Sequence, residues 1–159
     1  MKTRSLEEWT RLFTKLGVND PGQWAEAEAG ENLGNLPKAA FLKQAWSEIP
    51  RTNDGAWVEA WLKMARRQPD EAHIVAIYER MLAMGIANDE LASLFRGVMS
   101  QFLHRIAYLL DDPSLENEEL RENISWGFYE EDADVEEPVR RLGCLHELVF
   151  GLDPEYKED

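Results

Sequence analysis

The residues of this chain best suited to metal chemistry are three histidines, His73, His104 and His146. None is spaced with another histidine or with the cysteine as a pair of zinc ligands. A glutamate follows His146, as in the H-E-x-x-H zinc motif, but Phe150 stands where the second histidine belongs. We expect His73 to lie at the start of a helix and His104 to face solvent, and we predict no metal site.

Nucleophilic catalysis would fall to Cys144, the only cysteine of the chain. His146 lies two residues further on, a spacing that points two helical side chains to different faces. No serine stands in a G-x-S-x-G turn, and no glycine-rich loop is present to hold a phosphate. We therefore expect Cys144 to be a small buried thiol, and we predict no catalytic residue and no cofactor.

Carboxylates are abundant, and their densest run is Glu130-Glu131-Asp132, with Asp134 two residues later. The run is similar to a calcium-binding loop, but it lacks the central glycine and the terminal glutamate at the required separation. A solvated charged loop is the favoured interpretation.

The charge of the chain is concentrated in its last third. Residues 111–159 contain 17 acidic and 4 basic side chains, whereas residues 1–110 contain 14 acidic and 13 basic ones. Such a division indicates a strong negative field at one end of the molecule. That field attracts cations and basic proteins and repels nucleic acid and anionic membranes, so we expect no direct binding to either.

The elements that position these residues are predicted to be mostly helices. Capping residues, prolines and glycines give the boundaries, and apolar residues recur at helical spacing between them. The longest stripe includes Leu91, Leu94, Val98, Phe102 and Leu109. Helices are expected from Ser5 to Gly17, after Asp20, from Pro37 to Glu48, after Asn53, from Ile74 to Gly85, and from Asn88 to Asp111, with a loop over 29–36.

The pattern changes after Pro113. One or two acidic helical turns are expected within 114–123, and 124–129 alternates as a strand does. A charged loop over 130–138 would lead to a partner strand over 139–142, and a short helix over 145–152 would follow. We expect Trp126 and Phe128 to pin this hairpin to the helices, which leaves Tyr129 on the other face.

The fold class predicted from these elements is mainly α. It is an irregular helical bundle of about six to seven helices with a small C-terminal β-hairpin or extended appendage. Residues 1–159 are expected to form a single domain, in which 1–110 is a near-neutral helical body and 111–159 an acidic C-terminal subregion. The sequence contains no run of about 18 apolar residues, so no membrane-spanning helix is predicted. The start of the chain lacks the apolar segment of a secretory signal, and the lone cysteine favours a cytoplasmic location.

The leading functional hypothesis is an acidic binding or inhibitor protein that is not an enzyme. In general character the chain resembles bacterial immunity proteins, which are compact, lack catalytic constellations and carry acidic surfaces against basic toxin domains. The resemblance implies a basic partner, such as a toxin or nuclease domain, that is occluded by carboxylates and an aromatic anchor. The candidate partner-binding residues are Glu116, Glu118, Glu119, Glu122, Tyr129, Glu130, Glu131, Asp132, Asp134, Glu136 and Glu137.

The alternative is a helical enzyme or a small-ligand-binding regulatory protein with a pocket between helices. Its candidate anion contacts are Arg66, Arg67, Arg80, Arg96 and Arg105. A third possibility is that the acidic charge serves solubility alone. The sequence leaves open which of these holds, the identity of the partner and the oligomeric state.

Overall fold

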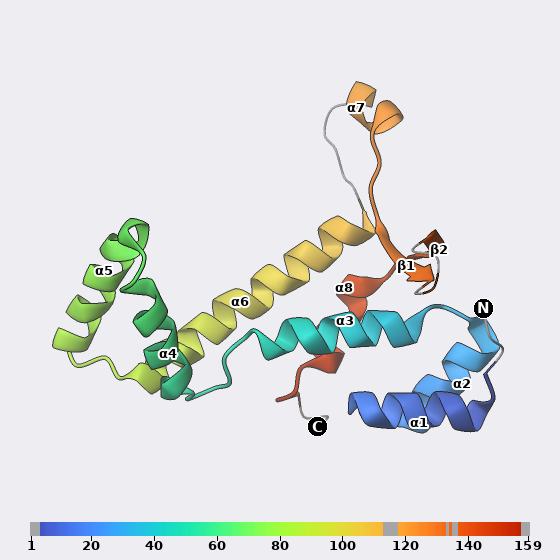
Figure 1. Cartoon of the computed structure of the whole chain (residues 1–159), viewed down its shortest axis with the longest axis horizontal. Coiled ribbons are helices and arrows are strands. Elements are labelled where there is room, and N and C mark those ends of the chain that lie inside the picture. The colour runs from blue at the N-terminus through green and yellow to red at the C-terminus, as the bar shows by residue number, and fades with distance from the viewer. Residues whose placement is uncertain (1–3, 113–117, 133, 135–136, 157–159) are drawn as a thin grey trace. The chain divides into compact units, whose positions relative to one another are not determined.

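The computed structural model describes residues 4–112, 118–132, 134 and 137–156. Within these residues the chain forms eight α-helices, two short 3-10 helices and one two-stranded antiparallel sheet near the C-terminus (Figure 1). The prediction of a mainly α fold with a C-terminal hairpin is confirmed.

The chain divides into two compact units, which are described in turn. The first unit consists of 1–46 and 102–159, and the second of 47–101. The expected single domain over 1–159 stays a prediction.

The first unit opens with two helices whose ends follow the sequence signals. α1 (Leu6–Leu16) begins at a capping box between Ser5 and Glu8, which satisfies two backbone N–H groups that have no partner inside the helix. α2 (Pro21–Glu31) begins at Asp20, whose carboxylate accepts a backbone N–H of the first turn. α1 buries Trp9 and Phe13 of its predicted apolar face, whereas Leu6 at its start is exposed.

The segment 29–36 was predicted as a loop, and this prediction was wrong. α2 continues through Gly30 to Glu31, and α3 (Asn35–Ser47) begins two residues before Pro37, which was expected to open it. The carboxylate of Glu28 accepts the backbone N–H of Asn35 at 2.5 Å and so caps α3 from the preceding helix. A long-range cap of this kind leaves no local signal, so the glycines and the proline suggested a longer interruption than the fold contains.

Gly34 lies in the short link between α2 and α3 with a φ of 71°. A Cβ there would overlap the side chain of Leu142 and crowd the guanidinium of Arg140. We expect Gly34→Ala to lower the free energy of unfolding by about 1–3 kcal/mol through overlap and left-handed backbone strain, measured by urea denaturation. Gly30→Ala is the matched control: a Cβ meets nothing within 4 Å there, and alanine favours the helix by up to about 1 kcal/mol. Equal losses in the two variants would contradict the prediction.

The C-terminal part of the first unit contains α7 (Glu118–Asn123), β1 (Phe128–Asp132), β2 (Glu137–Leu142), α8 (Leu145–Leu148) and the 3-10 helix η2 (Phe150–Leu152). The segment after the hairpin is almost wholly buried along one side, through Leu145, Val149 and Leu152. It packs on α3, where the indole Nε1 of Trp46 donates a hydrogen bond of 2.8 Å to the carbonyl oxygen of Val149. The predicted apolar face of this last helical segment is therefore a core face.

The strands lie further along the chain than the alternation suggested. The first was expected over 124–129 and occupies 128–132, and the second begins at 137 instead of 139. Strand pairing is a backbone property, so it continues through acidic residues, with a bulge between Glu130 and Glu131. The anchoring role of two aromatics is confirmed: the ring of Phe128 lies 4.8 Å from that of Phe41, and Trp126 Nε1 donates to the Leu109 carbonyl at 2.6 Å.

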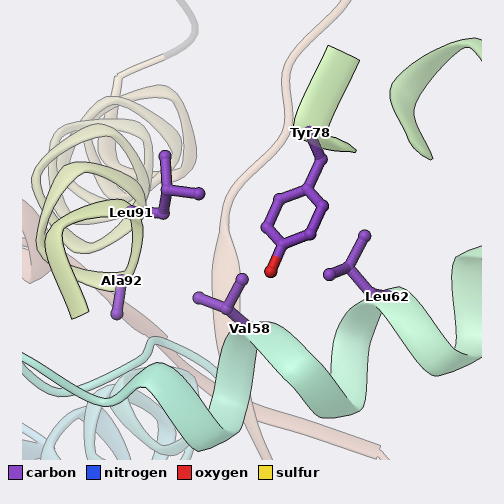
Figure 2. Packing of buried hydrophobic residues seen from close by; sticks show 5 residues of the cluster. All are labelled: Val58, Leu62, Tyr78, Leu91 and Ala92. Carbon is purple, nitrogen blue, oxygen red and sulfur yellow. The ribbon is translucent and has the colours of Figure 1, made fainter. Parts of the chain in front are cut away.

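The second unit contains α4 (Gly55–Ala65), η1 (Pro69–Glu71), α5 (Ala72–Ala83) and the start of α6 (Asn88–Asp111). Its core is a cluster contributed by all three α-helices, and Figure 2 shows Val58 and Leu62 on α4 with Tyr78 close by. The cluster consists of Val58, Leu62, Tyr78, Leu91 and Ala92. Partly buried Trp57 and Trp61 pack against it, which is the core role their spacing indicated.

The long helix α6 is confirmed, but its apolar stripe is buried only near its start, where Leu91 belongs to the core cluster. Leu94, Val98 and Phe102 are exposed, whereas small residues such as Ala92 and Ala107 are fully buried. Hydrophobic periodicity gives large side chains most weight, so it does not find a face on which alanines allow close approach. None of the helices in the described ranges is both long enough and apolar enough to cross a membrane.

Candidate functional site

Four carboxylate residues lie at the far end of the β-hairpin. Glu131 and Asp132 end β1, Glu137 begins β2, and Asp134 lies in the turn between them. Asp132 and Glu137 are direct cross-strand partners, so their side chains are neighbours. We call Glu131, Asp132, Asp134 and Glu137 the hairpin tip. Within the described part of the chain none of the four forms an ion pair, so their charges are not neutralised.

Glu130 does not belong to this group, although the sequence placed it there. Its Oε2 accepts a hydrogen bond from Nε of Arg140 at 2.5 Å, and its side chain is largely buried. The charge of Glu130 is therefore balanced within the protein and is not presented to a partner.

The α7 carboxylates form a separate set. Glu118, Glu119 and Glu122 are exposed, but Figure 1 shows α7 standing away from the hairpin. Two further candidates, Glu116 and Glu136, lie outside the described residues. The structure thus divides the predicted acidic surface and brings together only the hairpin tip.

Tyr129 has the exposure that its place in the strand predicted. Its neighbour Phe128 is turned toward α3, whereas Tyr129 is 47% exposed. It lies on the same strand as two members of the hairpin tip. Its cross-strand partner is Arg141. An exposed tyrosine on the strand that ends in the tip carboxylates is a type of anchor that protein interfaces use.

The base of the hairpin is cationic, in contrast to its tip. Arg140 is the centre of a buried network in which its guanidinium contacts Glu130, Glu28 and Asn32. Nη2 lies 3.2 Å from Oε1 of Glu28, a side chain that is fully buried. Since a buried charge must be paired, this network holds the hairpin against the link between α2 and α3.

Lys38, on α3, is a second buried cation at the hairpin base. It is 4% exposed, and its Nζ donates to the carbonyl oxygen of Gly143 at 3.3 Å. Burial lowers the pKa of the Lys38 ammonium below its ordinary value, and the nearby Cys144, Glu28 and Asp111 oppose this shift.

Asp111 and His146 form a close pair beside this region. Oδ2 of Asp111 lies 2.6 Å from Nδ1 of His146 and also accepts its backbone N–H at 2.8 Å. Oδ1 of Asp111 is buried without a hydrogen-bond partner among the described residues. The pair fixes the start of α8 on the end of α6.

A pocket of about 650 Å³ opens between the hairpin base, the α2–α3 link and α8. Its polar lining contains three basic side chains and one acidic one, although the chain as a whole carries a net charge of −14. The lining residues are Asn32, Leu33, Asn35, Lys38, Arg140, Arg141, Gly143, Cys144, Glu147 and Leu148. We call this the hairpin-base pocket.

Two predictions about single side chains require correction. Cys144 is exposed, not buried, because it occupies a left-handed turn with a φ of 58° between β2 and α8. His104 is half-buried, and its ring is stacked on Phe150 with 5.2 Å between centroids. His73 bonds to the Asp70 carbonyl at 3.0 Å, which confirms its place at a helix start.

Two of the arginines considered for an inter-helix pocket have partners within the second unit. Arg66 pairs with Glu79 at 3.2 Å, and Arg96 donates to the Pro50 carbonyl at 2.9 Å. Three other basic residues, Lys38, Arg140 and Arg141, line the hairpin-base pocket together. The sequence could have pointed to the two arginines, because Arg140-Arg141 is the only adjacent basic pair of the acidic region. It contained no comparable indication for Lys38.

Comparison with protein-family models, with curated proteins and with solved structures found no match to this chain. Among the residues that the structure describes, no group of three or more His, Cys, Asp or Glu side chains is arranged to hold a metal ion. The interpretation therefore depends on the hairpin and its surroundings.

Proposed function

We propose that the chain is an acidic binding protein that captures a basic protein partner through the hairpin tip. In its sharpest form it is a cytoplasmic, immunity-type inhibitor that occludes the basic surface of a toxin or nuclease domain. A nuclease surface is already built to accept the negative charge of phosphates, so it is a natural target for such a protein.

The observation that carries the proposal is the uncompensated charge of the hairpin tip. Arg140 neutralises Glu130 lower in the same hairpin, yet no described cation pairs with the tip carboxylates. Like charges placed side by side cost free energy in the isolated protein, and a cationic partner would relieve that cost. Tyr129 supplies an exposed aromatic on the same strand.

The proposal is tested by neutralising the tip without changing its shape. The full chain is immobilised, its partner is captured from an extract of the source organism and identified by mass spectrometry, and association rates are measured by stopped flow. We expect Glu131→Gln, Asp132→Asn, Asp134→Asn and Glu137→Gln together to slow association at least about tenfold at low salt. The wild-type rate should fall steeply as salt rises, because ions screen exposed charges.

The matched control removes the same formal charge from exposed positions outside the hairpin. Glu7, Glu26, Glu31 and Glu48 are all exposed, and glutamine at these four positions should change the rate by no more than about twofold. If both quadruple variants slow association equally, the effect is one of net charge and the hairpin tip is not the docking site. Wild-type rates that stay flat from low to high salt would also refute the proposal.

A further inference from the structure

The hairpin-base pocket is lined by two cations, Lys38 and Arg141, that form no ion pair with a carboxylate among the described residues. Nζ of Lys38 bonds to the Gly143 carbonyl, and Nη2 of Arg141 bonds to the carbonyl oxygens of Asp111 and Trp126. Neither side chain forms an ion pair within the described ranges. All of these acceptors are neutral, so neither cation is held in an ion pair, although Glu28 and Asp111 lie near enough to Lys38 to favour its charged form.

Arg140 lines the same pocket but, unlike Lys38 and Arg141, it is paired with carboxylates. Its guanidinium contacts two carboxylates, those of Glu28 and Glu130, and it is therefore a structural group. Lys38 is more deeply buried than the arginine beside it and lacks such a partner. Buried charges in proteins are normally paired, and an unpaired one lining a cavity indicates a ligand.

The remaining lining suits a small organic molecule. The pocket of about 650 Å³ falls in the size range of small-molecule sites, which combine apolar walls with a few convergent polar groups. Leu33 and Leu148 provide the apolar surface, and the one acidic side chain, Glu147, is not paired with either free cation. We propose that the hairpin-base pocket binds a small organic anion, with its carboxylate or phosphate group held between Lys38 and Arg141.

This function is independent of the hairpin tip. The pocket lies at the opposite end of the hairpin from the four tip carboxylates, and it selects the opposite sign of charge. Burial lowers the pKa of Lys38 below its ordinary value even though Glu28 and Asp111 lie nearby and favour the charged form.

Cys144 makes the proposal directly testable, because it is the only cysteine of the chain, is exposed and lines the pocket. The rate at which its thiol reacts with the neutral reagent 4,4′-dithiodipyridine reports whether the pocket is occupied. We expect phenyl phosphate or benzoate to slow this reaction in a saturable manner. Benzyl alcohol, the neutral analogue of the same ring, should have no such effect, and sodium chloride serves as the control for ionic strength.

The residues are tested with Arg141→Gln and Lys38→Met, compared with Arg105→Gln. Losing one charge-assisted hydrogen bond should weaken protection by about 10- to 100-fold in ligand concentration. Arg141 is exposed, so its variant tests the site even if the buried lysine variant fails to fold. Arg105, exposed on α6, should keep full protection.

Three results would overturn the proposal. They are no protection of the wild type by either anion, equal protection by benzyl alcohol, and unchanged protection in Arg141→Gln. Protection by only one of the two anions would support the proposal and assign the head group. None of these outcomes bears on the hairpin tip, whose neutralised variant should be protected as the wild type is.

Discussion

Arg140→Ala is expected to lower the free energy of unfolding by about 3–5 kcal/mol. The substitution removes the partner of Glu28, whose carboxylate is fully buried, and also releases Glu130. An uncompensated buried carboxylate is costly, since water cannot solvate it in place of the guanidinium. The loss is measured by urea denaturation followed by circular dichroism.

Companion variants separate the network from the charge alone. Arg140→Lys keeps the charge but loses the planar fork that reaches Glu28, Glu130 and Asn32 together, so it should be intermediate. Glu28→Gln combined with Arg140→Ala should recover part of the loss, because no buried carboxylate then remains unpaired. Arg105→Ala, at an exposed position, should change stability by no more than about 0.5 kcal/mol. A loss for Arg140→Ala no larger than that of this control would show that the network adds nothing.

Trp46→Ala is expected to have a comparable effect, with a loss of about 3–5 kcal/mol. The side chain is 2% exposed and belongs to the contact between α3 and the C-terminal segment. Its truncation leaves a cavity that surrounding side chains fill only in part. It also removes the indole N–H that donates a hydrogen bond to the Val149 carbonyl oxygen. Urea denaturation again provides the measurement.

Phenylalanine variants at two tryptophans isolate the indole hydrogen bond. Trp46→Phe keeps most of the buried area but leaves the Val149 carbonyl without its donor, at a cost of about 1–3 kcal/mol. Trp126→Phe removes the same kind of bond, 2.6 Å long, from a side chain that is 37% exposed. Water can replace the donor there, so the loss should stay below about 1 kcal/mol. The reverse order of the two losses would argue against burial as the cause.

The sequence alone determined the helix ends that carry local caps and the presence of a hairpin, but not the exact bounds of the strands or of the α2–α3 link. Ser5, Asp20 and Gly17 set helix ends at the expected places, because caps act within one turn of the residues that carry them. The hairpin and the outward position of Tyr129 followed from alternation within a few residues. The concentration of acidic charge in the last third was likewise a property of the chain.

Tertiary structure alone decided which charges stay free. Glu28 and Lys38 lie on neighbouring helices, and Arg140 is more than 100 residues further along the chain. Each has the sequence context of an ordinary surface residue, and only the packing of α2, α3 and the hairpin brings them together. That convergence neutralises Glu130, leaves the hairpin tip uncompensated and creates the hairpin-base pocket. The physical reason is the distance along the chain over which each interaction acts. Propensity and capping act between near neighbours, whereas pairing and desolvation of a charge depend on whichever distant segments the folded chain places beside it.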